Sequence, residues 1–344
     1  MKHILNTLYI TQPKSYLFKE GSTVVVKQEK KKILQVPIHT LGQIVCFGFS
    51  IVITPPLMSF CCENSVSIAW LSDTGKFLGR VEGPVKGNVL LRREQHRWAD
   101  DAEKSLGIAR SVIAAKINNS RMNLQRFLRN QSGYQQEEAM QDKIDKFACL
   151  LPDVEKSVDL DTLRGIEGEA AGLYFGVFDQ LIVKQKEVFK FKGRSRRPPL
   201  DRVNALLSFT YTLLAFDIRS ALETVGLDPY VGFLHADRSG RPSLALDLME
   251  EYRAPFADRL VLSLINRKQV TENQFVVQGT GEVQMNDECR KTLIVAYQNR
   301  KKETIVHPFL DEKMEIGLVF QTQAKLLARY IRGDLDLYPA FIWR

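Results

Sequence analysis

The sequence predicts an α+β protein, in which a small N-terminal β-strand domain (residues 1–90) precedes a larger, mostly α-helical domain (residues 91–344). Two observations lead to this prediction. Up to about residue 90, short runs of β-branched and aromatic residues alternate with Gly, Pro and charged turns. Beyond that point, apolar residues recur at the spacing of amphipathic helices. At 344 residues and 44% hydrophobic content, the chain is long enough for two domains.

The first half reads as a series of short strands. They are ILNTLYI, SYLFKE, STVVVKQ, KKILQVPI, GQIVCF and VSIAWL, followed by a turn and a final strand in SDTGKFLGRVEG. One helix interrupts them at PPLMSFCCEN, because prolines suit a first helical turn. Several of these strands are sheet edges, so we expect this half to be a surface for self-association.

The second half reads as helices. Ile113, Ile117, Leu124 and Leu128 are spaced as in a helix, and Glu103 to Gln131 carries six Lys or Arg against a single acid. Gly and Pro separate the further helices. We expect these near 135–151, 160–180, 201–226, 243–266, 286–302 and 313–333, with a small hairpin at 275–285.

Cysteine use and hydropathy indicate a cytoplasmic location. The five cysteines include no CxxC pair and show no zinc-finger spacing, and their odd number favours reduced thiols. We find no run of about 18 uncharged apolar residues, so no membrane association is expected. The N-terminus lacks the apolar segment and cleavage site of a signal peptide.

The net charge of +8 is concentrated in places. From Lys184 to Arg202, the segment KQKEVFKFKGRSRRPPLDR holds eight basic and two acidic residues, a local charge of +6, with Phe189 and Phe191 interleaved. A solvated loop is one interpretation. Clustered Arg and Lys that neutralise phosphates are the interpretation we favour, and it implies a nucleic-acid partner.

One histidine lies in a Gly- and Pro-punctuated segment, VGFLHADRSGRPSLALDLMEEYRAP. His235 precedes a helix that Ser243 could cap, and Asp247 and Glu250 are three residues apart on one helical face. The segment is either a loop before a helix with acids on its solvent face, or a metal site. A neutral imidazole with carboxylates suits Mn²⁺ or another transition metal, whereas carboxylates alone suit Mg²⁺.

A second candidate is LDTLRGIEGEAAGLYFGVF, in which Glu167 lies between Gly165 and Gly168. The glycines leave room for a backbone or a substrate to approach closely. A carboxylate that faces inward on this apolar-rich helix is costly unless it is paired or metal-bound. The alternative is a helix whose acids face solvent.

Taken together, three segments resemble the CRISPR-associated integrase, the larger of the two core proteins that insert new spacers into CRISPR arrays. They are LRGIEGEAAGLYF, RRPPLDRVNALLSFTYTLL and GFLHADRSGRPSLALDLMEEYRAPFADRLVL. The resemblance extends through HPFL at 307–310 and the ending QAKLLARYIRGDLDLYPAFIWR, and is greatest to type I versions. It implies that Glu167, His235 and Glu250 are metal ligands for Mg²⁺ or Mn²⁺, and that Asp247 is a further catalytic residue.

The resemblance also implies partners and a reaction. The chain is expected to form homodimers through its β domain, and two dimers flank a dimer of a small ferredoxin-like partner in a heterohexamer on double-stranded DNA. A 3′-hydroxyl then attacks a phosphodiester. Residues expected to grip phosphates are Arg194, Arg196, Arg197 and Lys291. Two alternatives stay open, namely an integrase of the same fold from a mobile element and a non-catalytic DNA-binding scaffold.

Overall fold

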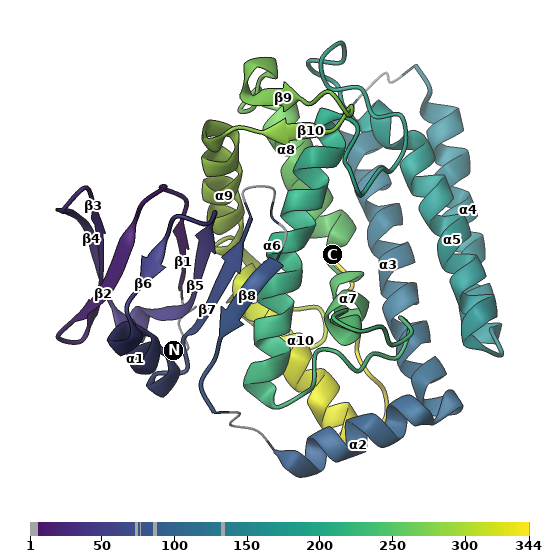
Figure 1. Ribbon diagram of the computed structural model, residues 1–344. Helices are drawn as coiled ribbons and strands as arrows, with labels where there is room; N and C mark the ends of the chain where they lie inside the picture. The colour runs from purple at the N-terminus through teal and green to yellow at the C-terminus, as the bar shows by residue number, and fades with distance from the viewer. Residues whose placement is uncertain (1–5, 73–74, 76, 85–87, 132–134, 344) are drawn as a thin grey trace. The chain divides into compact units, whose positions relative to one another are not determined.

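The computed structural model describes residues 6–72, 75, 77–84, 88–131 and 135–343, and its chain forms two compact units, 1–86 and 87–344. The first is built of strands and the second is mostly helical, which confirms the predicted fold class (Figure 1). The expected domain boundary at 90/91 lies four residues further on, inside the first turn of a helix that begins at Val89.

The first unit contains two four-stranded sheets and one helix. In the first sheet the order is β1-β5-β7-β8, where β1 and β7 run parallel to β5 and β8 runs antiparallel to β7. Its strands are β1 (Asn6–Ile10), β5 (Leu41–Phe47), β7 (Ser67–Leu71) and β8 (Phe77–Val81). In the second sheet the order is β4-β3-β2-β6. Its strands are β2 (Tyr16–Glu20), β3 (Thr23–Gln28), β4 (Lys31–Pro37) and β6 (Val52–Ile53).

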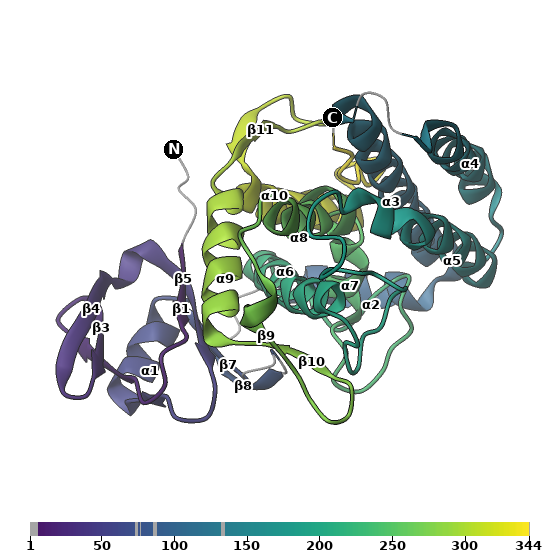
Figure 2. The same cartoon turned by 90° about the horizontal axis from the view of Figure 1, so that it is seen from above.

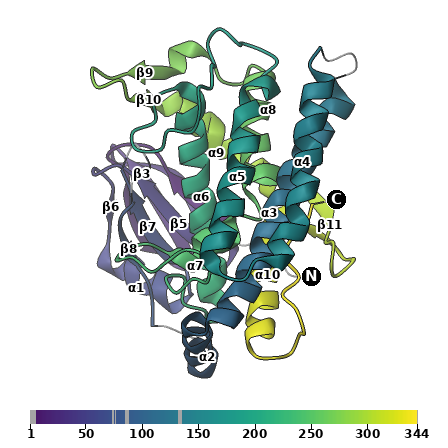
Figure 3. The same ribbon diagram turned by 90° about the vertical axis from the view of Figure 1, so that its right-hand side faces the viewer.

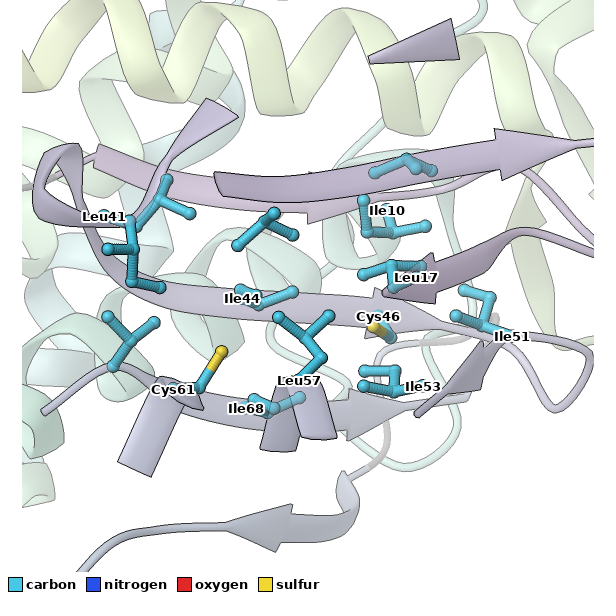
Figure 4. Close-up of a cluster of buried hydrophobic side chains, with 14 residues drawn as sticks. Ile10, Leu17, Leu41, Ile44, Cys46, Ile51, Ile53, Leu57, Cys61 and Ile68 are labelled. Atoms are coloured by element: carbon cyan, nitrogen blue, oxygen red, sulfur yellow. The ribbon is translucent and has the colours of Figure 1, made fainter. Parts of the chain in front are cut away.

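A single cluster of buried side chains joins both sheets to α1 (Pro55–Glu63), the helix that the paired prolines predicted. Figure 4 shows Ile44 of β5 beside Leu57 and Cys61 of α1, with Leu17 of β2 in the same cluster. Ile44, Leu57 and Leu17 are completely buried. Truncation of one such leucine to alanine typically costs about 2–5 kcal/mol, so this cluster contributes strongly to the stability of the first unit.

Some edge strands of the first unit carry exposed apolar side chains. Ile33 and Leu34 on β4 are 44% and 40% exposed, and Leu78 on β8 is 40% exposed. Strand edges with exposed apolar residues are prone to pair with another chain.

The second unit is a helical bundle with two short hairpins. Figure 3 shows α4 and α5 beside α3, and Figure 2 shows α10 and α8 close to α6. The helices are α2 (Val89–Asp100), α3 (Ala102–Asn130), α4 (Glu137–Lys156), α5 (Leu160–Val177), α6 (Arg202–Val225), α7 (Ser243–Met249), α8 (Arg259–Asn266), α9 (Asp287–Lys301) and α10 (Ile316–Ile331). Shorter helical turns lie at Phe178–Leu181 and Glu272–Gln274, and the first unit has one at Ile38–Thr40. The hairpins are β9 (Phe275–Val277) with β10 (Val283–Met285), and β11 (Thr304–Val306) with β12 (Lys313–Glu315).

The sequence analysis missed strand β6, helix α2 and the second hairpin, and it was wrong about one helix. The single helix expected at 243–266 is divided into α7, a π-helical turn η3 (Arg253–Asp258), and α8. Pro255 explains the division, because a proline has no N–H for the helical ladder. The Ala257 N–H donates to Tyr252 O five residues earlier, as in a π-helix.

Among the described residues, α6 is long and apolar enough to cross a membrane by length and composition alone. However, 61% of its most apolar window is buried within the protein. A core helix of a folded domain has the same property.

Candidate functional site

Helix α5 presents Glu167 next to open space. The helix begins at Leu160, and the Asp159 side chain caps it by accepting a hydrogen bond of 2.7 Å from the Thr162 N–H. A Cβ atom added at Gly165 or Gly168 would meet nothing within 4 Å, so neither glycine is required by a close contact. Glu167 itself is 30% exposed and forms a short ion pair with Lys116 of α3. The helix surface at the two glycines is therefore not covered by other parts of the protein, and it lies beside the Glu167 carboxylate, which is paired with Lys116.

Both acids on α7 are buried, so the interpretation as a helix with a wet acidic face is wrong. Asp247 is 1% exposed and Glu250, at the C-terminal end of α7, is 3% exposed. Ser243 does not cap the helix as predicted, since it is the first helical residue and its hydroxyl donates to Ala236 O. A buried carboxylate is costly unless it is hydrogen-bonded or paired, and both are.

Asp247 organises the backbone that carries His235. Its Oδ2 accepts the N–H groups of Phe233 and Leu234 at 2.7 and 3.0 Å, and its Oδ1 accepts the His235 N–H at 3.0 Å. This arrangement needs a glycine at position 232, because a Cβ atom there would lie 2.8 Å from Asp247 Oδ2. The GF pair that precedes the histidine in the sequence thus serves a close backbone approach.

The same carboxylate fixes the imidazole of His235. The ring Nδ1 lies 2.6 Å from Asp247 Oδ1, so Nδ1 donates the hydrogen bond, and in the neutral imidazole this leaves a free lone pair on Nε2. Arg164, one turn before Glu167 on α5, donates to the Leu234 carbonyl at 2.8 Å. Arg164 thereby ties α5 to the histidine loop, which explains how residues far apart in the sequence share one site.

Lys116 joins the two glutamates. Its ammonium contacts Glu167 and lies 2.8 Å from Glu250 Oε2, while Arg253 Nη2 lies 3.1 Å from the other oxygen of Glu250. Burial by itself raises the pKa of the Glu250 carboxyl, but the charges of Arg253 and Lys116 outweigh it and lower the pKa to about 2. Glu250 is therefore an anion at any physiological pH.

The donor set fits a divalent cation, although the side chains do not surround one as they stand. Among the described residues, no group of three or more His, Cys, Asp or Glu side chains is close enough together to hold a metal ion. Instead the Lys116 ammonium lies between the two carboxylates, where a cation is attracted. Glu250 Oε2 is buried and accepts no hydrogen bond of good geometry, so its contact with Lys116 is electrostatic. Two carboxylates and one imidazole nitrogen are ligands that Mg²⁺ or Mn²⁺ accepts.

Sequence reasoning missed the cations of this site, Lys116, Arg253 and Arg164. Two of them had a signal. Lys116 belongs to the basic helix that was singled out at 103–131, and Arg253 follows Glu250 by three residues, the spacing of an ion pair along a helix.

The basic stretch at 184–202 is partly structural. Phe189 and Phe191 are buried, and are therefore core residues rather than platforms for bases. Arg194 is directed inward, since its guanidinium donates to Asn204 Oδ1 and Ser208 Oγ at 2.6 and 3.1 Å and lies over the Tyr211 ring.

The other three predicted phosphate-gripping residues, Arg196, Arg197 and Lys291, are exposed. Their role remains a prediction, whereas the internal contacts of Arg194 compete with a role on DNA.

Comparisons with known proteins agree on one family. The profile of the family described as "CRISPR associated protein Cas1" matches residues 8–299. The CRISPR-associated endonuclease Cas1 1 of Chlorobaculum tepidum is 51% identical over 344 residues, which is 100% of both chains. Among solved structures, a Cas1 protein from Thermotoga maritima has a TM-score of 0.81 at 23% identity, over 97% of this chain and 99% of its own. A casposase bound to integration product has a TM-score of 0.84 at 20% identity, over 98% and 94%. These two structures share the fold.

Proposed function

The chain belongs to the CRISPR-associated protein Cas1 family, and from this premise we propose that it is a divalent-metal-dependent DNA integrase and endonuclease that inserts spacers into a CRISPR array. One observation carries the proposal. Glu167 and Glu250 lie on separate helices, yet both carboxylates meet a single cationic group, Lys116. A relative 51% identical over the full length carries the name of a CRISPR-associated endonuclease, which favours this function over that of a mobile-element integrase or a passive scaffold.

Each residue of the site has a role in this proposal. Glu167, Glu250 and the Nε2 atom of His235 would hold Mg²⁺ or Mn²⁺, and Asp247 keeps the imidazole in the tautomer that leaves Nε2 free. When bound, the metal would neutralise charge that develops on the reacting phosphate. Arg253 keeps Glu250 ionised.

The reaction is a transesterification. The 3′-hydroxyl oxygen of the incoming DNA forms a new bond to phosphorus at the edge of a repeat. The bond from that phosphorus to the old 3′-oxygen breaks, and this oxygen leaves with a proton as a new 3′-hydroxyl. Water in place of the attacking hydroxyl gives strand cleavage, so one site accounts for both integrase and endonuclease activity.

The test is strand transfer into a supercoiled plasmid that carries the array. Glu167→Ala, His235→Ala and Glu250→Ala should each reduce product by at least about 100-fold, because the loss of one ligand displaces the metal. Glu169→Ala is the matched control, since Glu169 is exposed on the same helix. A donor that ends in a 3′-dideoxynucleotide should give no product with any variant. Full activity of Glu167→Ala would refute the assignment, and equal insertion into a plasmid without the array would favour the mobile-element function.

We further propose that the working assembly is a homodimer joined through the first unit. Two such dimers bind a dimer of a small ferredoxin-like partner and double-stranded DNA in the cytoplasm. The exposed apolar residues on edge strands β4 and β8, such as Leu34 and Leu78, support this proposal. Light scattering of the intact chain and of residues 87–344 tests it, because the second unit alone should be monomeric. A dimer of 87–344 would place the interface in the helical unit.

A further inference from the structure

The helical unit contains a cavity that the proposed reaction does not use. Its volume is about 440 Å³, within the range of sites that hold one small molecule. Residues of α3, α8 and α9 line it, and Figure 2 shows α8 between the other two helices. Neither the proposed metal ligands nor Asp247 and Lys116 line it.

The cavity is strongly basic. Arg126, Arg259, Arg267 and Arg300 line it together with a single acid, Glu303, which gives the lining a formal charge of +3. Glu303 is 3.1 Å from Arg300 and is therefore already paired. In the described part of the chain, neither Arg126 nor Arg259 has a carboxylate within ion-pair distance.

The inner guanidinium groups are held in place. Arg259 and Arg300 both lie over the ring of Trp343, at 5.5 and 5.8 Å, and Arg300 Nη2 donates to Pro255 O at 2.8 Å. The Arg300 Nε atom is buried and has no hydrogen-bond partner. Burial, together with the like charges of Arg300 and Arg126, lowers the pKa of Arg259 to about 10. Four arginines that share a cavity lining with one acid, Glu303, are a pre-formed environment for an anion.

Packing alone is the competing explanation. A single arginine over the Trp343 ring would be enough for packing. Packing does not explain why further arginines line the same cavity. The planar donor fork of arginine matches phosphate oxygens, and several arginines around one cavity suit a group with more than one negative oxygen.

We propose that this cavity is a phosphate-binding site that takes one nucleotide, with its phosphate against Arg126, Arg259 and Arg300. Phe127 and Leu262 give the lining an apolar side for a sugar or base, and Asn130 and Asn299 give it neutral polar groups. The nucleotide is either part of a DNA strand or free in solution, because both present the same phosphate chemistry.

The experiment measures binding in EDTA, so that no metal contributes. The probes are fluorescently labelled dT₄, followed by anisotropy, and ATP, followed by equilibrium dialysis. For the probe that binds, Arg126→Gln/Arg259→Gln should weaken affinity at least about tenfold, since two charge-assisted contacts are lost. For dT₄, the slope of log affinity against log salt should also fall by up to about 0.7 per contact. Arg93→Gln/Arg329→Gln removes two exposed charges outside the cavity and should change affinity less than about twofold.

A second variant separates a loss of binding from a loss of folding. Arg126 is exposed, so Arg126→Gln alone leaves the Trp343 contacts intact and should still weaken binding about threefold or more. Binding of dT₄ alone identifies a DNA strand as the source, binding of ATP alone identifies a free nucleotide, and binding of both supports a site that reads only phosphate. The proposal fails if neither probe binds the wild type, or if the cavity and control variants lose affinity equally. None of these outcomes bears on the metal site, because the strand-transfer variants change other residues.

Discussion

Replacement of Lys116 by methionine should make the protein bind its metal more tightly. The ammonium lies between the carboxylates of Glu167 and Glu250, so a divalent cation that uses both must first displace it. Methionine has similar length and keeps the apolar contacts of a side chain that is only 13% exposed. The substitution therefore removes the competing charge and little else.

The size of the effect follows from the geometry. At the 2.8 Å between Lys116 Nζ and Glu250 Oε2, and an effective dielectric constant of about 20, the gross attraction is about 6 kcal/mol. Most of this is returned when the displaced ammonium is hydrated, and the net energy of the hydrogen bond that Lys116 donates to the charged Glu167 is about 1.5–3 kcal/mol. Lys116→Met should therefore raise metal affinity by about 10- to 150-fold.

Isothermal titration of the EDTA-treated protein with MnCl₂ measures this affinity directly. Lys104→Met is the matched control, because Lys104 is exposed on the same helix and its ammonium lies near Asp101 and over the Trp98 ring rather than between the two glutamates. Without metal, Lys116→Met should also lower the melting temperature, since buried Glu250 loses one of its two ion-pair partners and keeps Arg253, and excess Mn²⁺ should restore it.

Equal or weaker Mn²⁺ binding by Lys116→Met would refute this reasoning. The metal would then have to bind without displacing the ammonium, away from the space between the two glutamates. Strand-transfer activity is not the deciding measurement. In the wild type, the lysine that the metal displaces can still contact DNA phosphates, and Lys116→Met would remove that contact as well.

Three further predictions concern other parts of the helical unit. Gly232→Ala should weaken Mn²⁺ binding at least about tenfold, because its Cβ atom would press on Asp247 2.8 Å away and misplace the histidine loop; wild-type affinity would contradict this. Burial raises the pKa of Asp258 to about 6, so the unfolded chain loses this proton first and stability should fall by about 2–3 kcal/mol as pH rises from 4 to 6. Urea denaturation at pH 4.5 and 7.5 should show a decline that is smaller by this amount in Asp258→Asn than in the wild type, because burial also raises the pKa of Glu251 to about 7 and adds the same further decline in both proteins. An equal total decline in the two proteins would refute the assignment. Converting Arg196 and Arg197 to alanine should weaken all duplexes alike and reduce the salt slope by up to about 0.9 per residue, whereas an unchanged slope in filter binding would mean a solvated loop.

The sequence by itself determined the type of most elements and the identity of the acids and the histidine at the site. The strands before residue 82 other than β6, helix α1 with its two prolines and the long helix α3 follow from short-range patterns, because turn residues and apolar periodicity act within a few residues. The segments around Glu167 and His235 were identified in the same way, with the help of a family resemblance.

Only the tertiary structure decided how these residues are paired and which are buried. The pairing of Lys116 with Glu167 and Glu250 joins three helices, and no local pattern encodes a contact between segments so far apart. A run of basic residues in the sequence likewise does not show which of its side chains contact the protein interior. Arg194 was therefore grouped with exposed Arg196, although Arg194 donates a hydrogen bond to Asn204 within the same unit. The physical reason is common to both cases. The energy of a buried charge depends on the neighbours that packing brings to it, and those neighbours are set by the whole fold.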